Sequence, residues 1–338
     1  MKRILGILLI VVLLAGGIGC GEEGATTPEP TVTLEPTPTA TPTPAPDSDS
    51  MADYIYAGGM TTRKVWKLRT SDMSKVAESA TYGATIKALA EDADYIYAAG
   101  WSPTRKVWKI QKSDMTKVAE SIDHGGDLNA LAEDDDYIYT ADYVIQKVWK
   151  IQKSDMSKVG ASIAYGGTIY ALTEDADYVY AAGYAAQKVW KIQKSDMSKV
   201  AESADYGDTI YALAEDADYI YAGGMTSRTV WKIQKSDMSK VAESIAFDIC
   251  IYTMTEDTDY IYIGGGREVW KIQKSDMSKV GENADYSGAI WALAEEGDYL
   301  YACGSSPNRK VWKIQKSDMS KVAQSIDYGG SLYALAQP

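Results

Sequence analysis

One unit is repeated seven times after residue 50, and this repetition limits what the chain can fold into more than any other feature. Each unit contains a Val-Trp pair, and successive tryptophans are 42, 41, 41, 41, 39 and 42 residues apart. They are Trp66, Trp108, Trp149, Trp190, Trp231, Trp270 and Trp312. Seven Asp-Met pairs and seven Asp-Tyr pairs keep the same spacing. A period near 41 residues indicates a solenoid or a propeller. The secondary structure inside the unit distinguishes these two architectures.

Four short runs make up each unit, and most are rich in β-branched and aromatic residues. In one unit they span residues 168–173, 178–182, 188–194 and 199–204, separated by turn-forming segments such as Glu-Asp-Ala-Asp and Ser-Asp-Met-Ser. No segment has apolar residues at three-to-four spacing over ten positions, which argues against helical repeats. The pattern predicts an all-β fold, a seven-bladed β-propeller whose blades are four-stranded antiparallel sheets.

The ends of the repeated region, residues 51–338, do not coincide with the ends of a blade. The region opens on a second strand, near residues 53–58, and closes on an isolated first strand, near residues 331–336. We therefore expect the C-terminal strand to join the first blade. Such an arrangement closes the ring and removes an open sheet edge.

Two segments resemble repeats of known propellers. The Ile-Tyr-Ala-Gly-Gly run at 55–59 is similar to the Gly-Gly strand of kelch repeats, and the Lys-Ser-Asp-Met-Ser-Lys-Val run at 194–200 resembles quinoprotein-like (PQQ-like) repeats. The Gly-His and Trp-Asp signatures of WD40 repeats are missing. Residues 51–338 thus resemble the broad superfamily of seven-bladed and eight-bladed propellers, without a subfamily that can be assigned.

The first 20 residues have the pattern of a secretory signal. A positive start, Met1-Lys2-Arg3, precedes an apolar segment at 4–14 and a small-residue stretch that ends at Cys20. This ending resembles the lipobox of bacterial lipoproteins, which implies that Cys20 becomes the acylated first residue of the mature chain. The alternative is an uncleaved membrane helix, but residues 4–18 are fewer than the roughly 20 apolar residues that a span needs.

The composition of residues 21–50 predicts a disordered stalk. They contain seven prolines and eight threonines, a composition that favours an extended chain. At ~3.1 Å per residue such a segment reaches up to roughly 90 Å. Residue 21 is glycine, so the aspartate that retains Gram-negative lipoproteins at the inner membrane is absent. We expect an extracytoplasmic protein, anchored by lipid to the cell membrane or outer membrane and displayed at the cell surface.

Composition and charge exclude several classes of function. The formal net charge is −13, which argues against nucleic acid as a partner. One histidine and three cysteines cannot form an all-histidine or a four-cysteine zinc site within one chain. The acidic hairpins look like calcium sites, but a four-residue turn supplies too few oxygens, so we interpret them as solvated turns. They lie at 91–94, 133–136, 174–177 and 215–218.

Catalytic motifs are also missing from the sequence. It contains no Gly-x-Ser-x-Gly elbow and no phosphate-binding loop, and its histidine has no evident nucleophile partner. We therefore predict a protein that is not an enzyme and needs no cofactor or metal. Cys250 and Cys303 occupy different positions of adjacent units, which leaves two interpretations open: a disulfide, or two buried thiols.

Residues that recur in every unit are expected to stabilise the blade. The Trp of Val-Trp and the Ile or Leu two residues later point to one face of the sheet and should pack against the neighbouring blade. The Asp of Ser-Asp-Met-Ser can accept a hydrogen bond from the backbone N–H two residues later, and its methionine can fill the space beneath the turn.

Residues that differ between units are the candidates for a binding site. The loop after the second strand carries Trp101, Tyr143 and Tyr184 in three consecutive units. In the first strand, Lys87 and Asn129 stand where four other units have tyrosine, and His124 replaces a tyrosine just before Asn129. Aromatic rings around polar groups suit carbohydrate or peptide contact. We predict that these six residues bind a ligand; the alternative is neutral drift between duplicated units.

The predicted function is non-catalytic binding through one face of the ring. The expected partner is a surface glycan, a wall polymer or an envelope protein, with the lipid anchor as the sole membrane contact and the protein as a monomer. One alternative is a scaffold, like the eight-bladed propeller lipoprotein of the outer-membrane assembly machinery, which this chain resembles in anchor and fold. A quinoprotein-like enzyme is less favoured, because it would need calcium ligands and usually an eighth blade.

Overall fold

The structure is a computed structural model, and it describes residues 54–283 and 286–336. The description below concerns the unit of residues 49–338. The expected signal segment, Cys20 and the stalk lie outside the described residues. Among the described residues, there is no helix long and apolar enough to cross a membrane.

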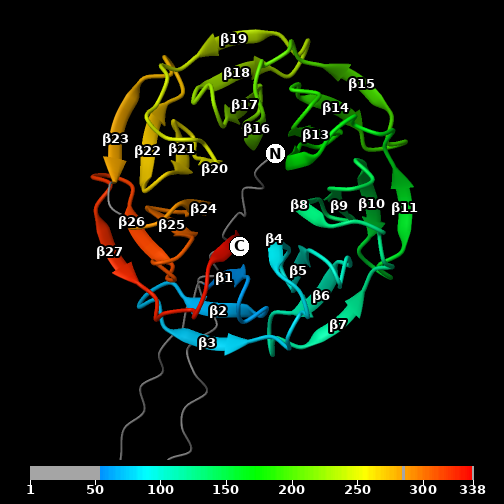
Figure 1. The fold of residues 1–338 in the computed structure, drawn as a ribbon, viewed down its shortest axis with the longest axis vertical. Coiled ribbons are helices and arrows are strands. Elements are labelled where there is room, and N and C mark those ends of the chain that lie inside the picture. Colours follow the sequence, from blue (N-terminus) through cyan, green and yellow to red (C-terminus); the bar gives the residue numbers. More distant parts are fainter. Residues whose placement is uncertain (1–53, 284–285, 337–338) are drawn as a thin grey trace, which may run out of the picture. The chain divides into compact units, whose positions relative to one another are not determined.

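Seven four-stranded antiparallel sheets are arranged as the blades of a ring (Figure 1). Blade 1 contains β28 (Leu332–Ala336), β1 (Tyr54–Gly59), β2 (Val65–Arg69) and β3 (Lys75–Glu78). Blade 2 contains β4 (Ile86–Glu91), β5 (Tyr95–Gly100), β6 (Trp108–Gln111) and β7 (Lys117–Glu120). Blade 3 contains β8 (Leu128–Glu133), β9 (Tyr137–Asp142), β10 (Val148–Gln152) and β11 (Lys158–Ala161). The predicted all-β propeller is confirmed.

The remaining blades repeat this pattern. Blade 4 contains β12 (Ile169–Glu174), β13 (Tyr178–Gly183), β14 (Trp190–Gln193) and β15 (Lys199–Glu202). Blade 5 contains β16 (Ile210–Glu215), β17 (Tyr219–Gly224), β18 (Val230–Gln234) and β19 (Lys240–Glu243). Blade 6 contains β20 (Thr253–Glu256), β21 (Tyr260–Gly265), β22 (Glu268–Gln273) and β23 (Lys279–Asn283). Blade 7 contains β24 (Ile290–Glu296), β25 (Tyr299–Gly304), β26 (Trp312–Gln315) and β27 (Lys321–Gln324).

The C-terminal strand closes the ring, as predicted. β28 pairs antiparallel with β1, with Tyr56 opposite Ala336 and Gly58 opposite Ala334. It also lies between β24 and β4, the innermost strands of blades 7 and 2 (Figure 1). Blade 1 is therefore assembled from both ends of the domain.

The hydrophobic core lies between neighbouring blades. The described residues form seven buried clusters, and each combines side chains from two adjacent blades. In one cluster, Trp108 and Ile110 of β6 pack with Tyr56 and Val65 of blade 1. Tyr82, from the connection between those blades, lies 5.0 Å from Trp108 between ring centroids. The predicted role of the Val-Trp repeat is confirmed.

The Ser-Asp-Met-Ser turn has the predicted hydrogen bond. In blade 1, the backbone N–H of Ser74 donates to Oδ1 of Asp72 at 2.9 Å. Met73 adopts a left-handed backbone conformation, with φ near 60°, and its side chain is 1% exposed. The same methionine is left-handed in all seven blades. Burial of the thioether offsets the steric cost of roughly 1–2 kcal/mol for this conformation.

The acidic hairpins are bound into the blade junctions more tightly than the solvated turns expected from the sequence. In the hairpin that joins β4 to β5, Asp92 accepts a hydrogen bond from the Tyr97 hydroxyl at 2.6 Å. Its carboxylate also lies 3.1 Å from Nζ of Lys153, and that lysine pairs with Glu133 of its own blade. The second aspartate, Asp94, is exposed.

Cys250 and Cys303 are free thiols in the structure. Cys303 is fully buried in β25, and Cys250 is half-buried just ahead of β20. Of the two interpretations, the structure therefore has separate thiols, one of them only partly buried.

Candidate functional site

The loops after the second strands share one face of the ring with the segments that enter the first strands. In six of the seven blades described, the first residue of the loop donates its backbone N–H to the carbonyl of a residue just ahead of the blade's first strand. Trp101 donates to Thr85 at 3.1 Å, and Tyr143 donates to Asp127 at 2.7 Å. Met60 makes the corresponding bond to Ser331 at 3.0 Å. We call this side of the ring the loop face.

In the loops after the second strands, the exposed apolar side chains belong to four consecutive blades. They are Met60, Trp101, Tyr143, Val144, Ile145 and Tyr184, between 39% and 62% exposed. The equivalent positions of blades 5 to 7, Met225, Gly266 and Ser305, are half-buried. Large apolar groups in surface loops have no role in blade packing, so their confinement to one sector is typical of an interaction surface.

Seven half-buried side chains line the inner strands beside this face, one from each blade. They are Lys87, Asn129, Tyr170, Tyr211, Tyr252, Trp291 and Tyr333. Tyr170 and Tyr211 stack with ring centroids 4.3 Å apart, and Tyr252 and Trp291 stack at 4.5 Å. Trp291 also lies 5.8 Å from Tyr333. We call these seven residues the inner ring.

Lys87 sits among three aromatic rings at one end of this series. Its Nζ lies 3.9 Å from the centroid of Tyr333, 4.8 Å from that of Trp101 and 5.7 Å from that of Trp291. Burial lowers the pKa of Lys87 to about 8. No carboxylate within residues 54–283 and 286–336 forms an ion pair with this lysine. Its charge is therefore stabilised by aromatic faces alone.

Asn129 connects the loop residue Trp101 to the inner ring. The indole N–H of Trp101 donates to Oδ1 of Asn129 at 3.0 Å. The next residue of the loop, Ser102, donates its backbone N–H to Asp127 at 2.6 Å. The Trp101 loop of blade 2 is thus fixed to blade 3, and the structure brings the predicted residues Lys87, Asn129 and Trp101 together.

Tyr143 begins the loop after β9. Burial raises the pKa of Tyr211 in the inner ring, and Tyr170, Tyr252 and Tyr143 add smaller effects in the same direction. Asp142 organises this loop, because one of its carboxylate oxygens accepts hydrogen bonds from the N–H groups of Val144 and Ile145 at 2.8 and 2.7 Å.

The structure does not bring Tyr184 or His124 into the cluster around Lys87. Tyr184 is 55% exposed on the loop face of blade 4. His124 is 5% exposed and packs beside Trp149, with ring centroids 5.8 Å apart, in the position that tyrosine occupies in most other blades. It belongs to the junction between two blades.

Trp291 and Tyr333 are the residues of this cluster that the sequence prediction did not include. Both occupy the repeat position that holds Lys87 in blade 2. That shared position was the signal that could have found them. Their contact with Lys87 depends on ring closure, which places blades 7, 1 and 2 side by side.

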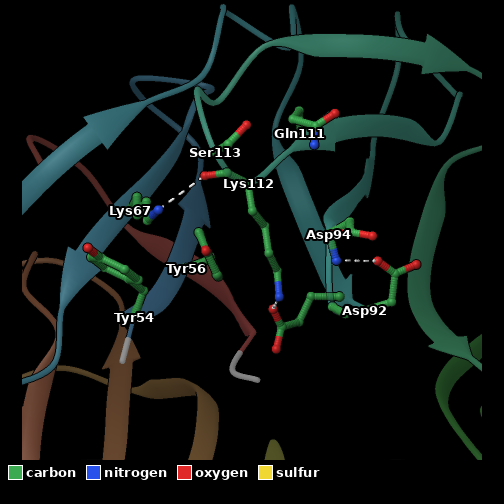
Figure 2. Close-up of a pocket in the computed structure, with 10 residues that line it drawn as sticks. Tyr54, Tyr56, Lys67, Asp92, Asp94, Gln111, Lys112 and Ser113 are labelled. Atoms are coloured by element: carbon green, nitrogen blue, oxygen red, sulfur yellow. Dashed lines mark hydrogen bonds and ion pairs between the residues drawn. The ribbon is translucent and has the colours of Figure 1, made fainter. Parts of the chain in front are cut away.

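A separate cavity of about 530 Å³ lies between blades 1 and 2, at the end of the blades that carries the acidic hairpins (Figure 2). Tyr54, Tyr56 and Lys67 line it from blade 1, and Asp92, Lys112 and other residues line it from blade 2. Lys112 pairs with Glu91, and Lys67 donates to the carbonyl of Lys112 at 3.1 Å. These contacts belong to the blade junction, and the cavity contains none of the predicted site residues.

The chemistry of the loop face is that of a binding surface. Around the inner ring it offers aromatic faces, the Lys87 ammonium group and the Asn129 amide. Within the part of the chain that the structure describes, there is no group of three His, Cys, Asp or Glu side chains suited to a metal ion. Such a surface can stack, donate hydrogen bonds and attract negative charge.

Comparisons with known proteins support the fold alone. No family model matches the sequence, and no curated protein matches it. The chain is similar in structure to the WD40 β-propeller domain of Doa1, with a TM-score of 0.64 and 10% identity over 74% of this chain and 86% of that one. It is also similar to the computationally designed Ika8 protein, with a TM-score of 0.64 and 10% identity over 84% and 90%.

These likenesses show a propeller. Because one fold hosts many functions, the function of this chain has to be argued from its own surface.

Proposed function

We propose that this protein is a lipid-anchored extracytoplasmic binding module that recognises a surface glycan, a wall polymer or an envelope protein through its loop face. The location rests on the sequence, namely the lipobox-like segment ending at Cys20 and the Thr/Pro-rich stalk at 21–50. The binding role rests on one observation, the sector of exposed apolar loops in blades 1 to 4, in which Trp101 contacts both Lys87 and Asn129.

The sector supports recognition because its parts have complementary roles. Exposed rings such as Trp101 provide contact area with few rotatable bonds, so little entropy is lost on binding. Lys87 and Asn129 provide directional polar groups beside them. Contact area and directional polar groups are sufficient for non-catalytic binding.

A pull-down from envelope extract tests the binding role. The bait is the full-length protein in detergent, compared with a variant that combines Trp101→Ala, Tyr143→Ala and Tyr184→Ala. A matched control truncates three exposed valines on outer strands: Val118→Ala, Val159→Ala and Val200→Ala. We expect the wild type and the valine variant to retain the same partner and the aromatic variant to lose it.

The chemistry of the retained material separates the finer possibilities. Bound sugar supports a glycan or wall polymer, and a defined set of membrane proteins supports the scaffold alternative. Retention of the same partner by all three baits would place binding outside the loop face. Incorporation of labelled fatty acid into the wild type, and its loss in Cys20→Ser, tests the anchor.

A further inference from the structure

Lys87 differs from the lysines of the blade junctions in having neither a carboxylate nor a backbone carbonyl as a partner among the described residues. Lys153 and Lys194, for example, each pair with two carboxylates. Lys87 has no hydrogen-bond acceptor within residues 54–283 and 286–336, although its ammonium group carries three donors. The side chain is half-buried, so a ligand at the loop face can reach it.

The three rings around Lys87 leave its hydrogen-bonding capacity unused. Aromatic faces attract a cation electrostatically but accept no conventional hydrogen bond, so the N–H groups still need oxygen atoms. A partly desolvated ammonium group gains more from an anionic oxygen than an exposed one does, because the effective dielectric constant around it is lower.

The indole ring of Trp101, beside Lys87, is held in a fixed orientation. Trp101 is 39% exposed, while its indole N–H is held by Asn129. Lys87 lies over one face of the indole, 4.8 Å from its centroid, so a sugar ring on the exposed part of Trp101 would direct its carboxylate past the edge of the indole to reach the lysine. An aromatic platform and an adjacent unpaired cation match a ligand that has both a flat apolar patch and a negative charge.

We infer that the cluster of Lys87, Trp101, Asn129, Trp291 and Tyr333 binds an acidic saccharide, whose sugar ring stacks on Trp101 and whose carboxylate pairs with Lys87. This inference rests on the proposed binding function and makes its ligand class specific. The net charge of −13 repels anions in general, so a preference for an acidic sugar has to come from a local cation.

Calorimetric titration with defined oligosaccharides tests this inference on the full-length protein. The probes are the trimers of galacturonate, glucuronate and mannuronate, each compared with its methyl ester, which keeps the sugar ring and removes the charge. We expect at least one free acid to bind about tenfold more tightly than its ester, as one charge-assisted contact provides.

Variants at residue 87 assign that preference to the lysine. Lys87→Tyr introduces the residue that four other blades have at this position, so it keeps the fold and removes the charge. It should abolish the preference for the acid and leave binding of the ester unchanged, while Lys87→Arg should keep the preference. Lys158→Met is the matched control, because Lys158 also lies over a tryptophan, 4.2 Å from the ring of Trp149, but on an outer strand. It should behave as wild type.

Two outcomes would overturn the inference, and they differ in what they imply for the proposed function. Equal binding of acids and esters would show a neutral-sugar site, so binding at the loop face would stand without acid recognition. Absence of binding by every trimer would reject this saccharide class, and a protein partner in the pull-down would then identify the loop face as a protein-binding surface.

Discussion

At the scale of single residues, His124 shows how one substitution changes a repeated contact. The equivalent residues that lead into blades 2 and 4, Tyr82 and Tyr165, donate their hydroxyl groups to the backbone carbonyls of Lys106 and Lys188 in those blades. His124 instead places Nε2 3.1 Å from Oγ of Ser121. Its Nδ1 is buried and has no hydrogen-bond partner among the described residues. Burial, with a smaller contribution from Lys158, lowers the pKa of His124 to about 4.

This histidine should make the protein less stable in mild acid. A neutral buried histidine contributes its full stability above the unfolded pKa of about 6.5, and this contribution is lost as the pH falls towards 4. The loss is up to about 3 kcal/mol in the free energy of unfolding. Urea unfolding at pH 7 and pH 4.5 measures it.

His124→Phe is the matched variant, because Phe247 occupies the same repeat position and packs on Trp270 at 4.8 Å. The raised pKa values of the junction glutamates act in the opposite direction in both proteins, so the difference between the proteins isolates the histidine. Equal pH dependence in wild type and variant would contradict the prediction.

The two thiols of the propeller should differ in reactivity. Cys303 is 0% exposed, and burial raises the pKa of its thiol, so little reactive thiolate forms. In a Cys20→Ser background, we expect a thiol reagent to modify Cys250 in the native protein and Cys303 only after unfolding. Mass mapping of the labelled peptides checks this order, and labelling of Cys303 at the native rate would refute it.

At the scale of elements, lysines join each blade to the next. In every blade, a lysine of the third strand donates to a backbone carbonyl of the following blade, at 2.7 to 3.1 Å. A second lysine joins the carboxylates of two blades at five junctions: Lys153, Lys194, Lys235, Lys274 and Lys316. Paired and partly buried charges thereby align the inner parts of the blades.

Removal of one bridging lysine should cost more than removal of a surface ion pair. Lys194 pairs with Glu174 and Asp134. Burial lowers the pKa of Lys194, but the hydrogen bonds that it donates to these two carboxylates outweigh burial and raise the pKa. Lys194→Met leaves two carboxylates facing each other and should lower the free energy of unfolding by about 1–3 kcal/mol.

Lys199→Met is the control for this prediction. Lys199 pairs with Glu202 within its own strand, where both side chains are more exposed, so its loss should cost less than about 1 kcal/mol. Chemical denaturation of both variants measures the contrast. A larger loss of unfolding free energy for Lys199→Met than for Lys194→Met would show that the ion pairs between blades do not contribute more to stability than the surface pair does.

At the scale of the whole molecule, stability depends on closure of the ring. Each buried cluster needs two neighbouring blades, so an open ring would expose one apolar blade face at each end. β28 prevents this, because Leu332 is fully buried and the strand pairs with β1 while packing between β24 and β4.

Deletion of residues 331–338 should therefore open the ring. We expect a large drop in melting temperature and aggregation through the exposed edge of β1, measured by thermal unfolding and size-exclusion chromatography. Moving the segment ahead of residue 51, joined by a Glu-Asp-Ala-Asp turn, rebuilds blade 1 from contiguous chain and should restore solubility. A monomeric, fully folded truncation would contradict the role of β28.

The sequence by itself determined the fold, because the same pattern of strands and turns can be read in seven copies of the unit. Short β-rich runs, turn residues and a 41-residue period leave a propeller as the consistent arrangement, and the offset of the ends predicts closure by β28. Differences between the copies also predicted Lys87, Asn129 and Trp101, which the structure brings together.

What the tertiary structure decided is which residues meet across blades. Trp291 and Tyr333 each occupy an ordinary inner-strand position of their own blade. Their contact with Lys87 exists only because ring closure places the last blade beside the first two. His124 is close to Asn129 in the sequence, yet its side chain packs at a blade junction beside Trp149. The reason is that its position in the repeat is a core position. Local patterns specify strands and turns, while contacts between distant segments depend on closure of the whole ring.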